Sequence, residues 1–395
     1  MKFLEDLINK IKPQFEKGGK YEKLYYVFEG FETFLFQLGN TTSGKGVHVR
    51  DAIDLKRLMM TVVVAMIPAL LFGMWNLGHQ YYLAVGEQAG FWYKFWIGIK
   101  VTLPLIIVTY AVGLGIEFFF CTIKKHPINE GFLVSGILIP LVVPPTIPLW
   151  QVALATAFAV IIAKEVFGGT GMNILNVALT ARAFLYFAYP MQISGEVWTY
   201  LGGETTVDGY SGATPLAIAA AAEGADNVIT AFANTWQGDM YSFGSMFFGF
   251  IPGSIGETST LMALIGGVLL IITGVGSWKI ITSVFAGAYV MGWIFNLAGA
   301  TPFMALPPHY HLVMGGLAFG AVFMATDPVT ATQTEKGKWI YGFLIGILTV
   351  LIRVFNPAYP EGIMLAILLM NVFAPLIDFY IVKANKKRRL QRATV

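Results

Sequence analysis

Apolar runs long enough to cross a lipid bilayer recur along most of this 395-residue sequence. A spanning helix needs about 20 mainly apolar residues, because lipid offers no partners for backbone N–H and C=O groups. Only 12% of the residues are charged, about half the share that is usual in soluble domains. The sequence therefore predicts an all-α, polytopic membrane helical bundle.

We expect about ten transmembrane helices. They are predicted at Leu58–Leu77, Val101–Cys121, Gly131–Ile147, Leu149–Phe167, Ile174–Tyr189, Ser259–Gly276, Ile280–Ala298, His311–Ala325, Trp339–Phe355 and Ile363–Val382. Several runs are short or interrupted, the third most of all, by Pro140, Pro144, Pro145 and Pro148. Broken helices persist at membrane depth only where protein or a polar cavity satisfies the freed backbone groups.

The spans divide the chain into five regions. Residues 1–57 form a cytoplasmic N-terminal extension, 58–190 a first five-helix half, 191–257 an outer loop, 258–382 a second five-helix half and 383–395 a basic tail. Near the N-terminus, leucines and isoleucines three and four apart predict short amphipathic helices at the membrane surface or on a partner. Charged residues interrupt the apolar ones there, so this segment is not a signal peptide.

Lysine and arginine predict the orientation. They gather before the first span and in the tail, which indicates that both termini are cytoplasmic and that the number of spans is even. From Ala183 to Trp278 there is no lysine or arginine at all, while acidic residues are frequent. We therefore expect the 191–257 loop on the outer, periplasmic side. Arg353 and Lys94 also fall on the outer side and are exceptions to the rule.

Composition excludes several classes of protein. A single cysteine rules out a disulfide framework and a cysteine-ligated iron–sulfur cluster within this chain. A net charge of +3 is too small to suggest nucleic-acid binding. Cys121, His309 and His311 form no metal-binding spacing, and we predict no metal site.

One motif stands out in the outer loop, where the chain reads Asp208-Gly209-Tyr210-Ser211-Gly212-Ala213-Thr214-Pro215. The pattern predicts a turn and then a helix, with Thr214 as N-cap and Pro215 at the first helical position. Two interpretations stay open from the pattern alone: an ordinary capped loop helix, or an anion site in which free N–H groups cradle a phosphate.

The motif resembles the flavinylation sequence of the NqrB/RnfD family, which comprises a membrane subunit of sodium-translocating NADH:quinone oxidoreductases and its counterpart in the related Rnf complexes. The resemblance implies that Thr214 carries FMN through a phosphoester bond, with Asp208, Ser211, Gly212 and Ala213 as the sequence that a flavin transferase recognises. It covers nearly the whole chain, in His48–Asp51, Asp54–Arg57, Asn129–Phe132, Pro144–Thr146, Lys164–Gly171, Ile251–Glu257, Met324–Val329 and Asn356–Gly362.

A glycine-rich stretch, Gly168–Asn173, lies with Asn176 and Arg182 between spans four and five on the inner side. It lacks the preceding strand and the glycine spacing of a dinucleotide site, and glycines can also serve close helix packing. Asn173 and Asn176 are three apart, which would place them on one helix face. The resemblance implies that these two amides help to hold a non-covalent riboflavin.

Three acidic residues lie in or beside apolar spans: Glu117, Asp327 and Asp378. Intramembrane carboxylates are costly and suggest function, and sodium is a hard cation that prefers oxygen ligands. The resemblance links all three positions to sodium uptake. The alternative is a structural role, as interfacial or capping residues. Lys164 and Glu165 could similarly form a neighbouring ion pair.

Gly113 and Leu114 occupy the place of a glycine pair that the family associates with quinone-site inhibitors, and leucine departs from that pattern. Aromatic residues of the N-terminal extension could cover a quinone or could serve packing only; they are Tyr21, Tyr25, Tyr26, Phe28, Phe31 and Phe34.

The resemblance implies a flavoprotein component of a redox-driven sodium pump in the bacterial inner membrane, which passes electrons from NADH toward quinone. The expected partners are an NADH-oxidising subunit with FAD and an iron–sulfur cluster, a second covalent-FMN subunit and small membrane subunits. The RnfD component of an Rnf-type complex and a non-redox channel or carrier are the alternatives. The long N-terminal extension favours the quinone oxidoreductase.

Overall fold

The structure is a computed structural model that describes residues 2–16, 18–36, 53–128, 132–194, 197–202, 210, 212–222, 227–235 and 238–393. These ranges contain helices and no strand, which confirms the all-α prediction. The helices are α1 (Lys2–Ile11), α2 (Tyr25–Leu35), α3 (Leu55–Val85), α4 (Phe91–Lys124), α5 (Leu133–Val142), α6 (Leu149–Phe158), α7 (Val177–Ala188), α8 (Pro215–Ala220), α9 (Val228–Ala233), α10 (Phe243–Phe248), α11 (Thr260–Ile272), α12 (Trp278–Ala298), α13 (Pro308–Val313), α14 (Leu317–Phe319), α15 (Glu335–Phe355) and α16 (Ile363–Ala393).

Five of these helices, α3, α4, α12, α15 and α16, are long and apolar enough to cross a membrane. Three shorter apolar helices, α5, α7 and α11, have 10, 12 and 13 residues. At 1.5 Å per residue they measure about 15–20 Å, which is less than the roughly 30 Å hydrocarbon core. The polytopic prediction is confirmed, although several of its spans are partial helices.

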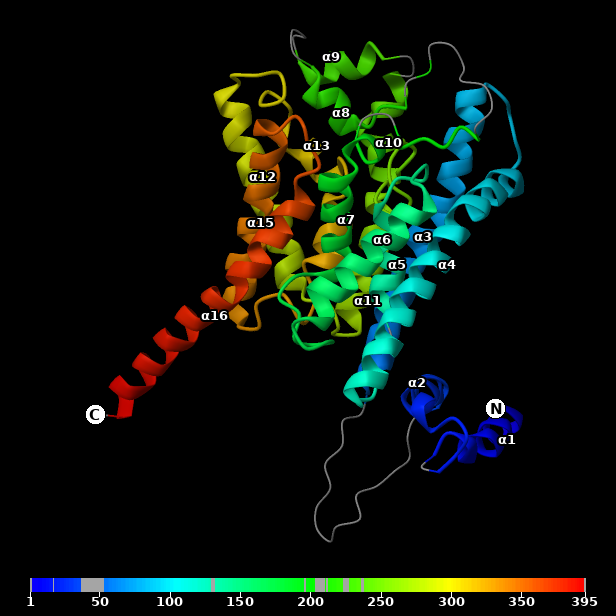
Figure 1. Ribbon diagram of the computed structural model, residues 1–395. Helices are drawn as coiled ribbons and strands as arrows, with labels where there is room; N and C mark the ends of the chain where they lie inside the picture. Colours follow the sequence, from blue (N-terminus) through cyan, green and yellow to red (C-terminus); the bar gives the residue numbers. More distant parts are fainter. Residues whose placement is uncertain are drawn as a thin grey trace.

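The long helices flank the short ones (Figure 1). On one side α3 packs against α4, and on the other α12 packs against α15, which also contacts α16. Between the two groups, α7 contacts α5, α6 and α16, while α11 contacts α3. One continuous apolar core joins both groups through residues such as Met66, Leu138, Leu179, Phe319 and Ile367.

Two predicted spans are not continuous helices. The third, Gly131–Ile147, is helical only as far as Val142, because prolines at 144 and 145 cannot donate the next backbone hydrogen bonds. The eighth, His311–Ala325, is split into α13, α14 and a π-helical segment, Gly320–Met324. A second π-helical segment, Ala159–Glu165, extends α6. Such segments are rare and occur frequently at functional sites.

The outer loop folds as a small helical cap made of α8, α9 and α10. Its own apolar cluster includes Leu216, Phe232 and Met246 and continues into Val313 of α13. In Figure 1 this cap lies at one end of the bundle, while both chain ends lie at the other. An even number of crossings requires this arrangement of the termini.

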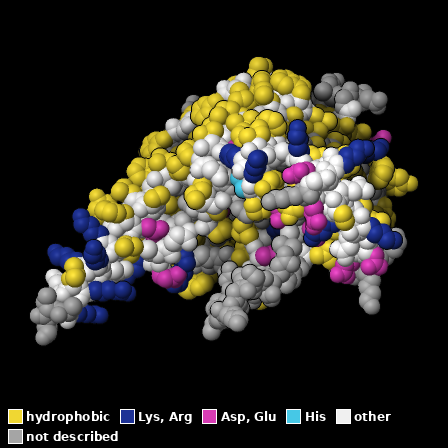
Figure 2. Space-filling model, turned by 60° about the horizontal axis from the view of Figure 1, so that its bottom comes forward, with side chains coloured by type: hydrophobic (Ala, Val, Ile, Leu, Met, Phe, Trp, Pro, Cys, Tyr) yellow, Lys and Arg dark blue, Asp and Glu magenta, His cyan; other side chains and the backbone are white. Residues whose placement is uncertain are grey.

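The N-terminal helices α1 and α2 lie beside the membrane bundle, with α2 on the end of α4. Phe31 contacts Phe118 of α4, with 5.6 Å between the ring centroids. Lys56, at the start of α3, donates a 3.1 Å hydrogen bond to the carbonyl of Gly30. Figure 2 shows lysine and arginine side chains gathered along the C-terminal part of α16 and over this end of the molecule.

Candidate functional site

A cavity of about 360 Å³ lies where the helical cap meets the bundle. Its wall is built from α7, α8, the segment before α11 and the segment that joins α15 to α16. Thr214 is part of this wall. A volume of this size lies within the range of small-molecule sites.

Thr214 is the N-cap of α8, as predicted: its Oγ1 accepts a 3.2 Å hydrogen bond from the amide of Ala217, and Pro215 is the first helical residue. The carbonyl of Ala213 accepts a 2.8 Å hydrogen bond from the hydroxyl of Tyr241, which fixes the turn before α8. Gly212 is buried, whereas Thr214 is only half-buried and can be reached from outside the protein. Asp208 and Ser211 lie outside the described residues.

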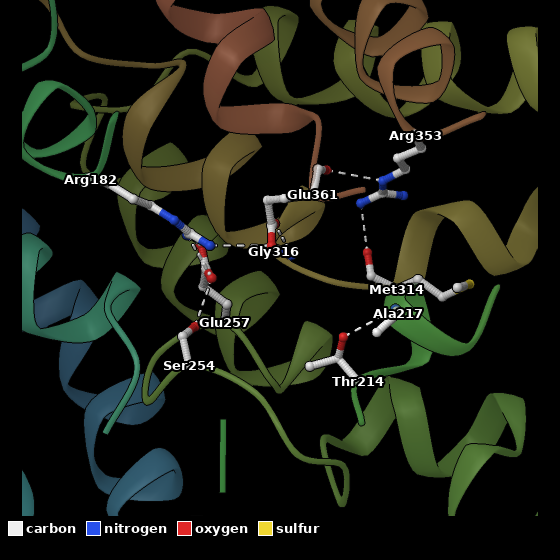
Figure 3. A network of polar contacts seen from close by, with 9 residues as sticks. All are labelled: Arg182, Thr214, Ala217, Ser254, Glu257, Met314, Gly316, Arg353 and Glu361. Atoms are coloured by element: carbon white, nitrogen blue, oxygen red, sulfur yellow. Dashed lines mark hydrogen bonds and ion pairs between the residues drawn. The ribbon is translucent and has the colours of Figure 1, made fainter. Parts of the chain in front are cut away.

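A buried charge network forms the floor of the cavity (Figure 3). Nη1 of Arg182 donates to both carboxylate oxygens of Glu257, at 2.8 and 2.9 Å, and Nη2 donates to Glu361 at 3.3 Å. Ser254 donates to Glu257 at 2.7 Å, and the amide of Gly316 donates to Glu361 at 2.8 Å. Buried ions persist when they are paired and hydrogen-bonded, and here both carboxylates and the guanidinium meet that condition.

Aromatic and unpartnered polar groups complete the cavity. The Trp198 ring lies 5.7 Å from the Arg182 guanidinium carbon, and burial raises the pKa of the Tyr359 phenol, which keeps it protonated. In the described structure, Nε of Arg182 and Oγ1 of Thr258 are buried without a hydrogen-bond partner. A flavin has a flat apolar ring system with a polar edge. The volume, the aromatic side chains and the two orphaned polar atoms therefore fit that group.

A second, smaller cavity of about 60 Å³ lies near the start of α7 and is lined by both Asn173 and Asn176. The prediction that these asparagines share a helix face is wrong, because α7 begins only at Val177. Asn176 is its N-cap and accepts from Leu179, a role that asparagine favours. Gly168, Gly169 and Gly171 all have positive φ, which unwinds the chain before it.

Asp327 lines the same small cavity and accepts a 3.3 Å hydrogen bond from Nδ2 of Asn176. Thr330 and the amide of Val329 also donate to it, at 2.9 and 3.1 Å. Asp327 follows the π-helical segment Gly320–Met324, where the regular backbone pattern ends. The structure thus brings a predicted riboflavin residue and a predicted sodium residue into direct contact.

Sixty cubic ångströms is room for about two water molecules, at roughly 30 Å³ each in the liquid. An isoalloxazine ring does not fit between these walls as they stand. The residues of the small cavity therefore suit water or a small cation, and we derive no step through riboflavin there.

Glu117 is 3% exposed and pairs with Lys164, while Glu165 pairs with Lys124 at 3.0 Å. The interpretation of Lys164 and Glu165 as partners of one another is therefore wrong. The two residues project from the π-helical segment Ala159–Glu165 to separate partners on α4. Glu117 and Glu165 line a third cavity, of about 170 Å³, together with Cys121 and His126.

Asp378 is bound to the start of α15 rather than to a cavity. Its carboxylate accepts from the amides of Gln333 and Thr334, at 2.7 and 3.1 Å, and from the Thr334 hydroxyl at 2.6 Å. These three donors define a helix-capping role.

Gly113 faces the ring of Phe132, and a Cβ at this position would overlap that ring. Leu114 packs against the main core. Both positions serve the contact between α4 and the residue that precedes α5.

Sequence reasoning did not identify Glu257 and Glu361 as site residues, and it placed Arg182 on the inner side. Arg182 lies within α7 and its side chain reaches the cavity next to Thr214. An arginine inside an apolar span was the signal that could have led to them, because such a charge needs buried acidic partners.

The sequence model of the NQR2, RnfD, RnfE family matches residues 42–387 of the chain. The NqrB protein of the Na(+)-translocating NADH-quinone reductase of Stutzerimonas stutzeri is 49% identical, over 98% of each chain. The proteins of the same name from Ectopseudomonas mendocina and Pseudomonas paraeruginosa are 50% and 48% identical. They share 98% of this chain and 98% and 99% of their own lengths.

Proposed function

The chain belongs to the NQR2, RnfD, RnfE family, and from this membership we propose that it is the NqrB component of a sodium-translocating NADH:quinone reductase. The relatives that cover its full length carry that name. The protein would then act in a multi-subunit membrane complex, in which partner subunits oxidise NADH and this chain carries electrons toward quinone.

The observation that supports a redox role is the position of Thr214. Its hydroxyl lies on the wall of a cavity that fits a flavin, and the residue is half-buried, so a flavin transferase can reach it. We propose that Oγ1 of Thr214 carries FMN as a phosphoester. When bound, FMN supplies one- and two-electron transfer. The protein's own contribution is the cavity: α8 and its cap cover it from outside, and Arg182 with Glu257 and Glu361 closes its floor.

We further propose that the helical cap faces the periplasm and that both termini are cytoplasmic. The cap contains no lysine or arginine, and basic residues concentrate at the opposite end of the molecule. For the transported sodium ion, the oxygen-rich position is Asp327 with Thr330, at the break after a π-helical segment.

The test is denaturing gel electrophoresis of the purified complex under ultraviolet light, from cells that contain a flavin transferase. The wild-type band of this protein should fluoresce, and Thr214→Ala should be dark. The matched control is Asn227→Ala, which removes the N-cap of α9 in the same helical cap and should remain fluorescent.

A dark wild-type band would refute the flavin proposal and favour a non-redox carrier. A fluorescent Thr214→Ala band would show that the flavin is attached elsewhere.

Riboflavin at Asn173 and Asn176 requires that the small cavity widens in the assembled complex. The Asn173→Ala/Asn176→Ala variant should then lose extractable riboflavin while it keeps covalent FMN. A full riboflavin content in this variant would remove both residues from the proposal.

A further inference from the structure

Two buried polar atoms in the large cavity have no hydrogen-bond partner in the described structure: Nε of Arg182 and Oγ1 of Thr258. Both residues line the cavity that contains Thr214. A buried donor or acceptor without a partner costs about 1–3 kcal/mol. Two such atoms in one cavity indicate that a polar group is meant to bind there.

Arg182 cannot satisfy its Nε by turning, because the rest of the guanidinium is held. Nη1 is bound to both oxygens of Glu257, and Nη2 is bound to Glu361. The two carboxylates are themselves fixed, Glu257 by Ser254 and Glu361 by the amide of Gly316 (Figure 3). The guanidinium is only 2% exposed, so Nε–H remains as one preset donor.

Trp198 restricts the direction from which a ligand can approach. Its ring covers the guanidinium at 5.7 Å, and such an arrangement is favourable for a cation. A planar ligand must therefore meet Arg182 at the edge that carries Nε. Thr258 lines the same cavity, and its hydroxyl can donate or accept.

We propose that Arg182 and Thr258 bind the polar pyrimidine edge of the isoalloxazine ring, whose other end is tethered at Thr214. This inference rests on the proposed function. The Nε–H group donates to the ring edge, and Glu257 and Glu361 hold the cation in place. Because a reduced flavin carries more electron density at this edge, a fixed cation and a hydroxyl donor favour the reduced form.

The experiment is a spectroelectrochemical titration of the purified complex, in which the flavin on Thr214 is isolated by its difference from the Thr214→Ala complex. The variants are Arg182→Lys and Thr258→Val. The matched control is Thr156→Val, since Thr156 is another buried threonine whose hydroxyl has no partner in the described structure and does not line the cavity. Covalent fluorescence on a denaturing gel is recorded for each variant.

All three variants should keep the fluorescent band. Arg182→Lys should reduce the preference for the reduced flavin at least tenfold, which lowers the midpoint potential by about 30 mV for a two-electron couple. Thr258→Val should lower it by about threefold, and Thr156→Val should leave it unchanged.

Thr258→Val removes one hydroxyl and leaves the buried ion network intact, so it decides the matter if Arg182→Lys does not assemble. Potentials for Thr258→Val and for an assembled Arg182→Lys that equal the control would overturn this inference while the flavin at Thr214 stands. A wild-type complex without Thr214-dependent fluorescence would instead overturn the proposed function.

Discussion

Arg353 offers a direct test of how the outer side of the second membrane half is held together. The side chain is fully buried in α15 and donates to three backbone carbonyls, those of His311 at 2.6 Å, Met314 at 2.7 Å and Glu361 at 3.1 Å. It thereby joins α13 to the segment before α16, and both border the large cavity. The change to make is Arg353→Met, which keeps an apolar stem of similar path and removes every donor.

The expected loss follows from these contacts. Hydrogen bonds from a charged donor contribute about 1.5 kcal/mol each at the low end, so three amount to about 4.5 kcal/mol. Removing a buried charge returns part of its desolvation cost, and we expect a net loss of about 3 kcal/mol. An unfolding entropy of about 2.1 cal/mol/K per residue over 395 residues gives roughly 0.8 kcal/mol/K. The unfolding midpoint should therefore fall by about 4 °C.

The assay is thermal unfolding of the detergent-solubilised complex, followed by the loss of the intact complex in size-exclusion chromatography after heating. Arg353→Lys is the control, because it keeps the charge but a single ammonium group cannot reproduce the geometry of the three contacts. We expect it to recover less than half of the loss. An unchanged midpoint in Arg353→Met would refute this reasoning, and full recovery in Arg353→Lys would show that charge matters rather than geometry.

The remaining predictions contrast matched pairs. Asp327→Ala should weaken the stimulation of quinone reduction by sodium, whereas Asp378→Ala should leave the sodium titration unchanged and cost about 1–2 kcal/mol of stability as a lost helix cap; equal sodium responses would contradict the assignment. Gly113→Ala should lower the yield of folded protein, because its Cβ would overlap the Phe132 ring. Gly115→Ala, on an open face of the same helix, should be neutral or stabilising by up to about 1 kcal/mol, and similar yields of the two variants would show that α4 can shift.

The main features of the fold were predictable because they depend on local composition. Long apolar runs give α3, α4, α12, α15 and α16, and the prolines after Val142 end α5 where the chain loses backbone donors. The cap at Thr214 was predictable for the same reason, since the side chain, the following proline and the helix are neighbours in sequence.

Long-range pairing could not be read from the sequence. Arg182 meets Glu257 and Glu361 from 75 and 179 residues away, and nothing in the local pattern selects those two carboxylates. The asparagine prediction failed for a different reason. A spacing of three implies a shared face only inside a helix, and glycines with positive φ keep Asn173 outside α7.

The two exceptions to the orientation rule have structural explanations. Arg353 is buried against backbone carbonyls. Lys94 contacts Nδ1 of His79 at 3.1 Å and lies over the ring of Trp75. The rule concerns cations in short loops near the ends of the spans, and both of these have specific partners inside helices.

The short length of α7 has an electrical consequence. Asn176 and Arg182 border the inner and the outer cavity and are six residues apart, about 9 Å along the helix axis. The transmembrane voltage falls mainly across the layer that conducts least, so the field is steepest where that layer is thin. A cation that moves past these two turns would do most of the work of a full crossing, about 2.3 kcal/mol for each 100 mV. The protein therefore needs to move a charge over only a few ångströms to work against the whole membrane potential.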